Sequence, residues 1–136
     1  MKTQVLSVEQ MKHLQELGVD TSKAKMSWYA IYETLPEWYN ELNIRDDVFD
    51  KNYPSVPTLT LQDMLEIFPT GIKAYGDYFE FEIVKHRTTY EIRYVNRDRE
   101  DLVSEEHSNL LICAYHLFCW LTEKGFLKGG KHEKRD

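Results

Sequence analysis

The stretch YFEFEIVKHRTTYEIRYV, which runs from Tyr78 to Val95, decides the fold class of this chain. Apolar and charged residues alternate in Tyr78–Val84, and they alternate again in Thr89–Val95. Successive side chains of a strand point to opposite faces, so this period of two predicts two strands, each with one apolar face. The short polar segment between the two strands predicts an antiparallel hairpin.

One register of this hairpin keeps the apolar residues together on one face. It pairs Phe79 with Tyr94, Phe81 with Ile92, and Ile83 with Tyr90. The turn then centres on residues 86–87, and because it lacks the Asn-Gly or Gly of a two-residue turn, we expect a four-residue loop. The same register places Glu80 opposite Arg93, which is favourable, and Glu82 opposite Glu91, which is not.

A helix is predicted between Ser7 and Gly18. Ser7 and Gln10 have the spacing of a capping box, in which each side chain accepts a hydrogen bond from the other residue's backbone N–H. Apolar residues then recur at helical spacing, at Val8, Met11, Leu14 and Leu17. Gly18 follows at the position where a helix commonly ends on a residue of positive φ.

The middle of the chain is less regular. Met26–Tyr32 alternates well enough to predict a strand that is covered on both faces or carries an exposed aromatic residue. Leu35–Leu42 suits either a short helix with Pro36 in its first turn or an irregular loop. Arg45–Val56, which is rich in Asp and contains Asn and Pro, is predicted to be a surface connection.

Two further helices are predicted. Thr58–Phe68 contains Thr60 three residues before Asp63, a capping pattern, and ends before a proline and a glycine. Glu100–Glu123 forms the longest predicted helix, with Gly125 at its end. Because this helix is apolar almost all round, we expect it to be buried across the sheet or to join two copies of the chain.

Together these elements predict a single α+β domain over residues 1–127, with a small antiparallel sheet of about three strands packed with three helices. Residues 128–136 form a basic tail that we expect to be disordered. No apolar run approaches the roughly 18 residues of a membrane span, and the first residues lack the apolar stretch of a secretory signal. With only two cysteines, a disulfide framework is excluded. We therefore expect a cytoplasmic protein without membrane contact.

The charge is unevenly distributed. The whole chain has a net charge of −6, from 17 basic and 23 acidic residues. The tail carries four basic and two acidic residues, which leaves −8 for residues 1–127. A body of this charge repels phosphate backbones, so it disfavours nucleic-acid binding. It suits a partner with a basic surface, and it suits plain solubility better.

Three segments carry a resemblance to other proteins: Leu6–Ser22, Pro57–Leu65 and Phe118–Leu127. In this order they resemble a group of small uncharacterised proteins from prophages and other mobile elements of gut bacteria. The likeness covers about half of the chain and includes no catalytic motif. It implies a bacterial cytoplasmic setting and an accessory role for a mobile element, with no activity or site residue.

The pattern C-x2-H-x2-C at Cys113, His116 and Cys119 is the nearest approach to a metal site or a thiol nucleophile. A tetrahedral metal site needs four converging groups, and steps of three residues make the outer two side chains diverge around a helix. A mid-helix thiol also has neither the helix N-terminus nor the oxyanion hole that activates a nucleophile. We interpret the three residues as packing residues.

The acidic residues offer no clearer site. Glu80 and Glu82 lie on one side of a strand, without a pocket to separate their pKa values for acid and base roles. The run Asp46-Asp47-x-x-Asp50-x-Asn52 lacks the glycine and final glutamate of a calcium loop. No phosphate-binding, dinucleotide-binding, serine-hydrolase or zinc-protease motif is present. No catalytic residue, metal ligand or cofactor is therefore predicted.

The aromatic residues are the remaining signal. Trp38, Tyr39 and Tyr53 lie in the least regular part of the chain, where they form either a protein-binding patch or a lid over the sheet. The aromatic residues of the hairpin are interpreted as core, because acidic neighbours do not suit base stacking.

The sequence thus predicts a non-enzymatic interaction or accessory protein with a protein partner, and a homodimer through the C-terminal helix. The alternatives are an enzyme with an unfamiliar Cys/His or carboxylate site, and a nucleic-acid binder that uses the basic turn at residues 85–87 and the tail.

Overall fold

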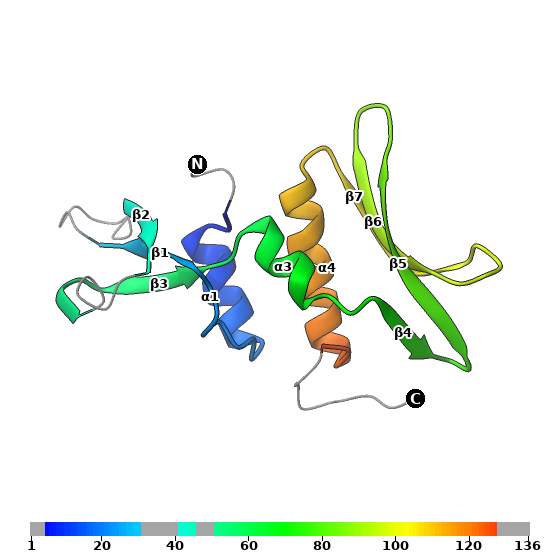
Figure 1. The fold of residues 1–136 in the computed structure, drawn as a ribbon, viewed down its shortest axis with the longest axis horizontal. Coiled ribbons are helices and arrows are strands. Elements are labelled where there is room, and N and C mark those ends of the chain that lie inside the picture. The colour runs from blue at the N-terminus through cyan, green and yellow to red at the C-terminus, as the bar shows by residue number, and fades with distance from the viewer. Residues whose placement is uncertain (1–4, 31–40, 46–50, 128–136) are drawn as a thin grey trace. The chain divides into compact units, whose positions relative to one another are not determined.

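The computed structural model describes residues 5–30, 41–45 and 51–127 (Figure 1). The contacts divide the chain into an N-terminal unit, Met1–Asp63, and a C-terminal unit, Met64–Asp136. The described residues form three helices and two antiparallel sheets. The α+β class is confirmed, but the prediction of one sheet with about three strands is wrong, because there are two sheets of three and four strands. That the chain is a single domain stays a prediction.

Helix α1 (Val8–Glu16) begins the N-terminal unit as the sequence predicts. The backbone N–H of Gln10 donates to Ser7 Oγ at 3.1 Å, and the N–H of Ser7 donates to Gln10 Oε1 at 2.9 Å. Gly18 follows the helix with a φ of 95°, a conformation that costs glycine little.

The three-stranded sheet has the order β2-β1-β3, with β1 at Met26–Tyr29, β2 at Glu41–Ile44 and β3 at Ser55–Thr58. The strand predicted over Met26–Tyr32 ends at Tyr29, and residues 31–40 lie outside the described part of the chain. Strand β2 includes the end of Leu35–Leu42, for which a helix or loop is predicted. Strand β3 includes the end of Arg45–Val56, for which a surface connection is predicted. Both predictions are wrong at these residues. Both strands are only four residues long, too short for a clear alternation to appear in the sequence.

In the N-terminal unit, two buried side chains donate hydrogen bonds to the backbone carbonyl of Leu6. This oxygen accepts hydrogen bonds from Trp28 Nε1 at 2.9 Å and from Thr58 Oγ1 at 2.7 Å. Both donors are buried side chains, so the two bonds satisfy polar groups that would otherwise be costly to remove from water.

Helix α3 (Leu61–Ile67) has the predicted capping pair, because Thr60 and Asp63 each accept a hydrogen bond from the other's backbone N–H. Its predicted start at Thr58 is wrong, since Thr58 ends strand β3. The boundary between the two units falls inside this helix, after Asp63.

The C-terminal unit holds a four-stranded sheet of order β4-β5-β6-β7. Its strands are β4 (Gly71–Ala74), β5 (Asp77–Lys85), β6 (Tyr90–Val95) and β7 (Asp101–His107). The hairpin of β5 and β6 is confirmed, with four residues between the paired Lys85 and Tyr90.

The predicted register of this hairpin is wrong by two residues. Phe81 pairs with Tyr94, Ile83 with Ile92, and Glu82 with Arg93. A shift of two leaves every side chain on its predicted face, so the alternation alone does not distinguish the two registers. The observed register replaces the unfavourable Glu82–Glu91 pair by a favourable Glu82–Arg93 pair.

The predicted helix Glu100–Glu123 is a strand followed by a shorter helix. Residues 101–107 form β7, and α4 runs from Leu110 to Lys124. Asn109 begins α4 as its N-cap, and Gly125 ends it with a φ of 77°, as predicted. Val103 and His107 fit a helical spacing and a strand spacing equally, which explains the error.

Helix α4 packs on β6 and β7. Its fully buried residues are Cys113, Ala114, Leu117, Phe118 and Leu121, so much of its apolar surface is used within the unit. Whether α4 also joins two copies of the chain stays a prediction. Among the described residues, no helix is long and apolar enough to cross a bilayer, and α4 itself has 15 residues.

The faces of the four-stranded sheet differ in chemistry. Ile92 and Tyr94 are fully buried on one face, where Phe68, Phe81 and Phe118 form ring contacts with centroid separations of 5.4 to 6.0 Å. The alternate side chains are polar, and we call their side of the sheet the polar sheet face. It comprises Glu82, Glu91, Arg93, Ser104 and Glu106.

Candidate functional site on the polar sheet face

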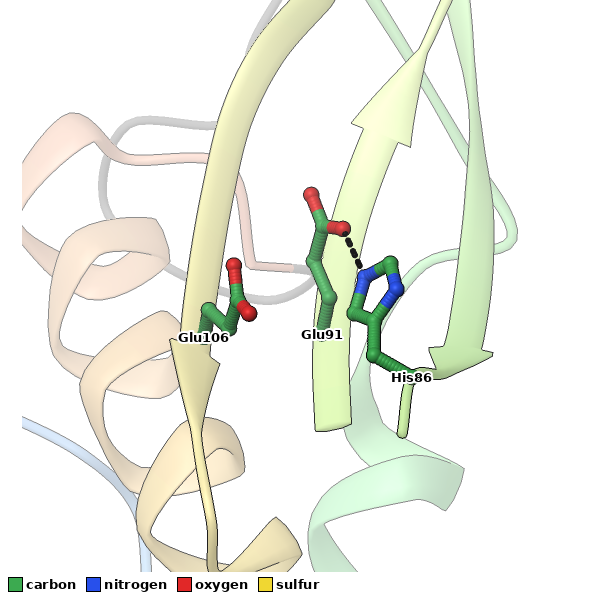
Figure 2. A group of neighbouring side chains, drawn as sticks. All are labelled: His86, Glu91 and Glu106. Carbon is green, nitrogen blue, oxygen red and sulfur yellow. Dashed lines mark hydrogen bonds and ion pairs between the residues drawn. The ribbon is translucent and has the colours of Figure 1, made fainter. Parts of the chain in front are cut away.

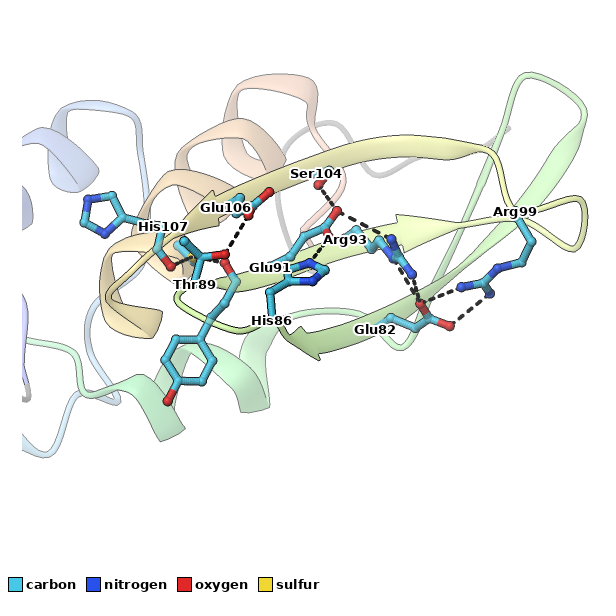
Figure 3. Close-up of polar contacts among 11 residues, drawn as sticks. Glu82, His86, Thr89, Glu91, Arg93, Arg99, Ser104, Glu106 and His107 are labelled. Carbon is cyan, nitrogen blue, oxygen red and sulfur yellow. Dashed lines mark hydrogen bonds and ion pairs between the residues drawn. The ribbon is translucent and has the colours of Figure 1, made fainter.

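Glu82 forms ion pairs with two arginines, Arg93 and Arg99, on the polar sheet face (Figure 3). Its Oε1 accepts from Arg93 Nε at 3.0 Å, and its two oxygens accept from Arg99 Nη1 and Nη2 at 3.0 and 3.1 Å. The hydrogen bonds from Arg99, followed by those from Arg93, lower the pKa of Glu82. Glu82 is therefore a permanent anion at neutral pH.

Glu91 lies in the middle of the same face, and its side chain is only 11% exposed. Ser104 Oγ donates to its Oε2 at 2.5 Å, and His86 Nε2 donates to its Oε1 at 2.8 Å. Arg93 Nη1 lies 3.5 Å from Oε2. The bonds from Ser104 and then His86 outweigh the opposing effect of burial and lower the pKa of Glu91.

Glu106 completes a cluster of three potential ligands with His86 and Glu91 (Figure 2). Glu91 and Glu106 are paired directly across strands β6 and β7, and His86 follows the end of β5. One donor atom from each of the three residues lies within 4.8 Å of the others. In the described part of the chain this is the one group of three or more His, Cys, Asp or Glu side chains with such convergence.

A groove of about 680 Å³ lies at the other end of the polar sheet face. We call it the acidic groove; its lining residues are Asp77, Tyr78, Glu80, Glu82, Val95, Asn96, Arg97, Asp98 and Arg99. The ring of Tyr78 lies where a side chain at Gly71 would be, since a Cβ there would fall 1.9 Å from its hydroxyl oxygen. Because Gly71 has no side chain, the ring of Tyr78 has room to lie against its backbone. Tyr78 is 46% exposed.

The turn between β6 and β7, which forms one wall of the acidic groove, is held by Asn96. This residue is 4% exposed, and its Nδ2 donates to Asp77 Oδ2 at 2.7 Å and to Glu100 Oε1 at 3.0 Å. Its Oδ1 accepts from the backbone N–H of Glu100 at 2.8 Å. Arg99 in this turn has a φ of 66°, a strained conformation for a residue with a side chain.

The side chains of the polar sheet face are poorly suited to catalysis by acid–base or nucleophilic chemistry. A catalytic carboxyl group commonly has a raised pKa, whereas those of Glu82 and Glu91 are lowered. Ser104 contacts Glu91 and not His86, so the order of a hydrolytic triad, with the imidazole between hydroxyl and carboxylate, is not formed. The arrangement suits electrostatic binding and cation coordination.

The C-x2-H-x2-C pattern lies on α4. Cys113 is buried and Cys119 half-buried, while His116 is exposed. Burial raises the pKa of both thiols, which keeps them protonated, and the Cys113 thiol donates to the backbone oxygen of Tyr90 at 3.2 Å. These features support the interpretation of the two cysteines as packing residues.

The predicted aromatic patch is not resolved by the structure. Trp38 and Tyr39 lie outside the described residues, and Tyr53 is half-buried. The patch therefore stays a prediction.

Sequence reasoning missed the cluster of His86, Glu91 and Glu106. His86 and Glu91 are separated by four residues at the hairpin loop. This spacing is the signal in the sequence that indicates that the two side chains are neighbours. Glu106 could not be assigned to this cluster, because the sequence predicts a helix for its segment.

Comparison of the chain with protein-family models, with curated proteins and with solved structures found no significant match.

Proposed function

We propose that this chain is a non-enzymatic binding protein whose acidic groove holds a basic segment of a protein partner. The observation that carries the proposal is the lining of the groove. Four carboxylates and two guanidinium groups line a volume of about 680 Å³, together with the half-exposed ring of Tyr78. Carboxylates and an aromatic ring are the groups that recognise lysine and arginine side chains.

The negative charge of the groove remains available to a ligand. Arg99 is engaged by both oxygens of Glu82, so the two largely neutralise each other. Asp77, Glu80 and Asp98 then outnumber Arg97. This excess agrees with the net charge of −6 of the whole chain, which attracts basic partners over distances of about a Debye length.

The groove is also organised before any ligand arrives. The hydrogen bonds of Asn96 fix the turn, and the positive φ of Arg99 is held in place by its bidentate contact with Glu82. A groove that is ordered in advance loses less conformational entropy on binding. Backbone strain of this kind is concentrated at binding and catalytic sites.

Binding is favoured over the alternative of an enzyme by the directions of the pKa shifts. The lowered pKa values of Glu82 and Glu91 make them weak bases, and the raised pKa values of Cys113 and Cys119 make them poor nucleophiles. The resemblance to small proteins of mobile elements fits an accessory role for such a binding protein.

A peptide titration tests this proposal. The intact ¹⁵N-labelled chain is titrated with an oligo-arginine nonamer and, separately, with an oligo-glutamate nonamer and a single-stranded oligonucleotide. We expect the cationic peptide alone to shift the amide signals of the groove, including those of Tyr78, Glu80, Asn96 and Asp98.

Two variants make the test specific. Glu80→Lys places a positive charge in the groove, and we expect it to weaken peptide binding at least tenfold, which corresponds to about 1.4 kcal/mol. Glu123→Lys makes the same change in net charge on the exposed side of α4, and we expect less than a threefold effect. Equal losses in both variants, or shifts spread over the whole acidic surface, would contradict the proposal.

A further inference from the structure

On the polar sheet face, two negatively charged side chains lie opposite each other on adjacent strands. Glu91 and Glu106 are directly paired across β6 and β7, where like charges are destabilising. Arg93 contacts Glu91 but not Glu106, and no basic side chain of the described residues forms an ion pair with Glu106. Among the described residues, Glu106 is thus the carboxylate of this pair whose charge no ion pair compensates.

The three side chains converge from different parts of the sheet. Glu91 Oε1 is already 2.8 Å from His86 Nε2, and the donor atoms of all three residues lie within 4.8 Å of one another. Ligand atoms around a tetrahedral Zn²⁺ ion, at bond lengths near 2.1 Å, are separated by about 3.4 Å. His86 and Glu106 are exposed, so the site would close by rotation of these two side chains.

The contacts around the cluster are those that orient metal ligands in proteins. Ser104 Oγ donates to Oε2 of Glu91 and leaves Oε1 directed at His86. Thr89 Oγ1 donates to Oε2 of Glu106 at 2.6 Å. Such outer hydrogen bonds fix the orientation of the coordinating carboxylates and are a recurrent feature of metal sites.

We propose that His86, Glu91 and Glu106 bind one Zn²⁺ ion, with the fourth position open to water. One imidazole nitrogen and two carboxylate oxygens are all accepted ligands of this ion. The ion replaces the proton that His86 Nε2 donates to Glu91, and its two positive charges remove the repulsion between the paired glutamates. This site is separate from the acidic groove and does not depend on the function proposed for it.

Calorimetric titration of the intact, metal-free chain with Zn²⁺ tests the proposal, together with the absorption spectrum of the Co²⁺ form. We expect one ion per chain and a Co²⁺ spectrum of nitrogen and oxygen ligands, without a thiolate charge-transfer band. A thiolate band would assign the ion to Cys113 or Cys119 and overturn the proposal, as would the absence of binding at 100-fold excess of Zn²⁺ over protein.

Substitutions at the two exposed ligands identify the site. Glu106→Gln keeps an acceptor for Thr89 and removes the charge, and His86→Gln removes the imidazole. We expect each to reduce the affinity for Zn²⁺ at least 30-fold, while circular dichroism remains that of the unchanged chain. The controls His116→Gln and His132→Gln remove imidazoles elsewhere in the sequence, and we expect effects below twofold. Equal losses in the ligand variants and the controls would overturn the site.

Discussion

Asn109 shows how one side chain can separate a strand from a helix. Its Oδ1 accepts from the backbone N–H groups of Leu111 and Ile112 at 2.8 and 3.3 Å, which satisfies two of the free donors at the start of α4. Its φ of −114° and ψ of 120° are those of extended chain, so the helix cannot continue towards β7.

Substitution of this residue gives a direct test of the cap. We expect Asn109→Ala to lower the free energy of unfolding by about 1 kcal/mol, because two backbone donors lose their acceptor. Asn109→Asp keeps the acceptor and adds a negative charge at the helix N-terminus, so we expect little loss. Urea unfolding followed by circular dichroism measures both, and an equal loss in the two variants would contradict this role.

Capping residues are the part of the fold that local sequence predicts best. The pair Ser7 and Gln10, the pair Thr60 and Asp63, and the terminating Gly125 are confirmed, because each acts within one turn of its own helix. Asn109 is equally local, but the sequence predicts a longer helix around it, because the apolar pattern continues on its N-terminal side.

At the level of strands, the two arginines that contact Glu82 are expected to contribute differently to the free energy of unfolding. Arg93 is 21% exposed and contacts both Glu82 and the nearly buried Glu91, whereas Arg99 is 59% exposed and contacts Glu82. Without Arg93, the nearly buried Glu91 would keep only its bonds from Ser104 and His86, and removing a partner from a buried carboxylate is costly, while exposed ion pairs contribute little.

We therefore expect Arg93→Ala to lower the free energy of unfolding by about 2 kcal/mol, through the loss at Glu91. For Arg99→Ala we expect a loss below about 1 kcal/mol. Chemical denaturation of both variants in the same buffer gives the comparison. A larger loss for Arg99→Ala would show that the ion pair in the groove, and not the buried one, stabilises the sheet.

The register of the hairpin shows what alternation alone does not determine. Phe79, Phe81 and Ile83 keep the same face in the predicted and observed registers, so burial of apolar residues does not separate the two. The distinguishing information was electrostatic, in the pairing of Glu82 with Arg93 instead of Glu91. Strands β2, β3 and β4 were missed because four residues carry too little pattern.

At the scale of the whole molecule, the two ionised glutamates make stability depend on pH. The folded-state pKa values of Glu82 and Glu91 lie below their ordinary value of 4.5, so their contribution is fully present above that pH. It is lost as the pH falls through the folded-state values, because the carboxylates must then be protonated.

We expect the urea midpoint of the chain to be similar at pH 7 and pH 5.5 and to fall below pH 4.5. In the double variant Glu82→Gln and Glu91→Gln, the difference between pH 5.5 and pH 3 should be smaller than in the unchanged chain. A difference of the same size in both proteins would mean that other carboxylates carry the dependence on acid.

Little of the candidate site could be read from the sequence. The acidic groove depends on the turn held by Asn96 and on the place of Tyr78 over Gly71, which are contacts between strands and not between neighbours in the chain. Glu106 joins His86 and Glu91 only because residues 101–107 form a strand. The cluster with Glu106 therefore depends on strand β7, a segment for which the sequence predicts a helix.

The position of the unit boundary inside α3 has a practical consequence for anyone who expresses the two halves separately. A cut after Asp63 would leave the Thr60–Asp63 cap without a helix to begin, and would deprive Met64–Phe68 of its first turn. The boundary lies within helix α3. A C-terminal fragment that starts at Leu59 retains the cap together with every residue of the four-stranded sheet and α4, and is the sensible boundary for isotope labelling of that half alone.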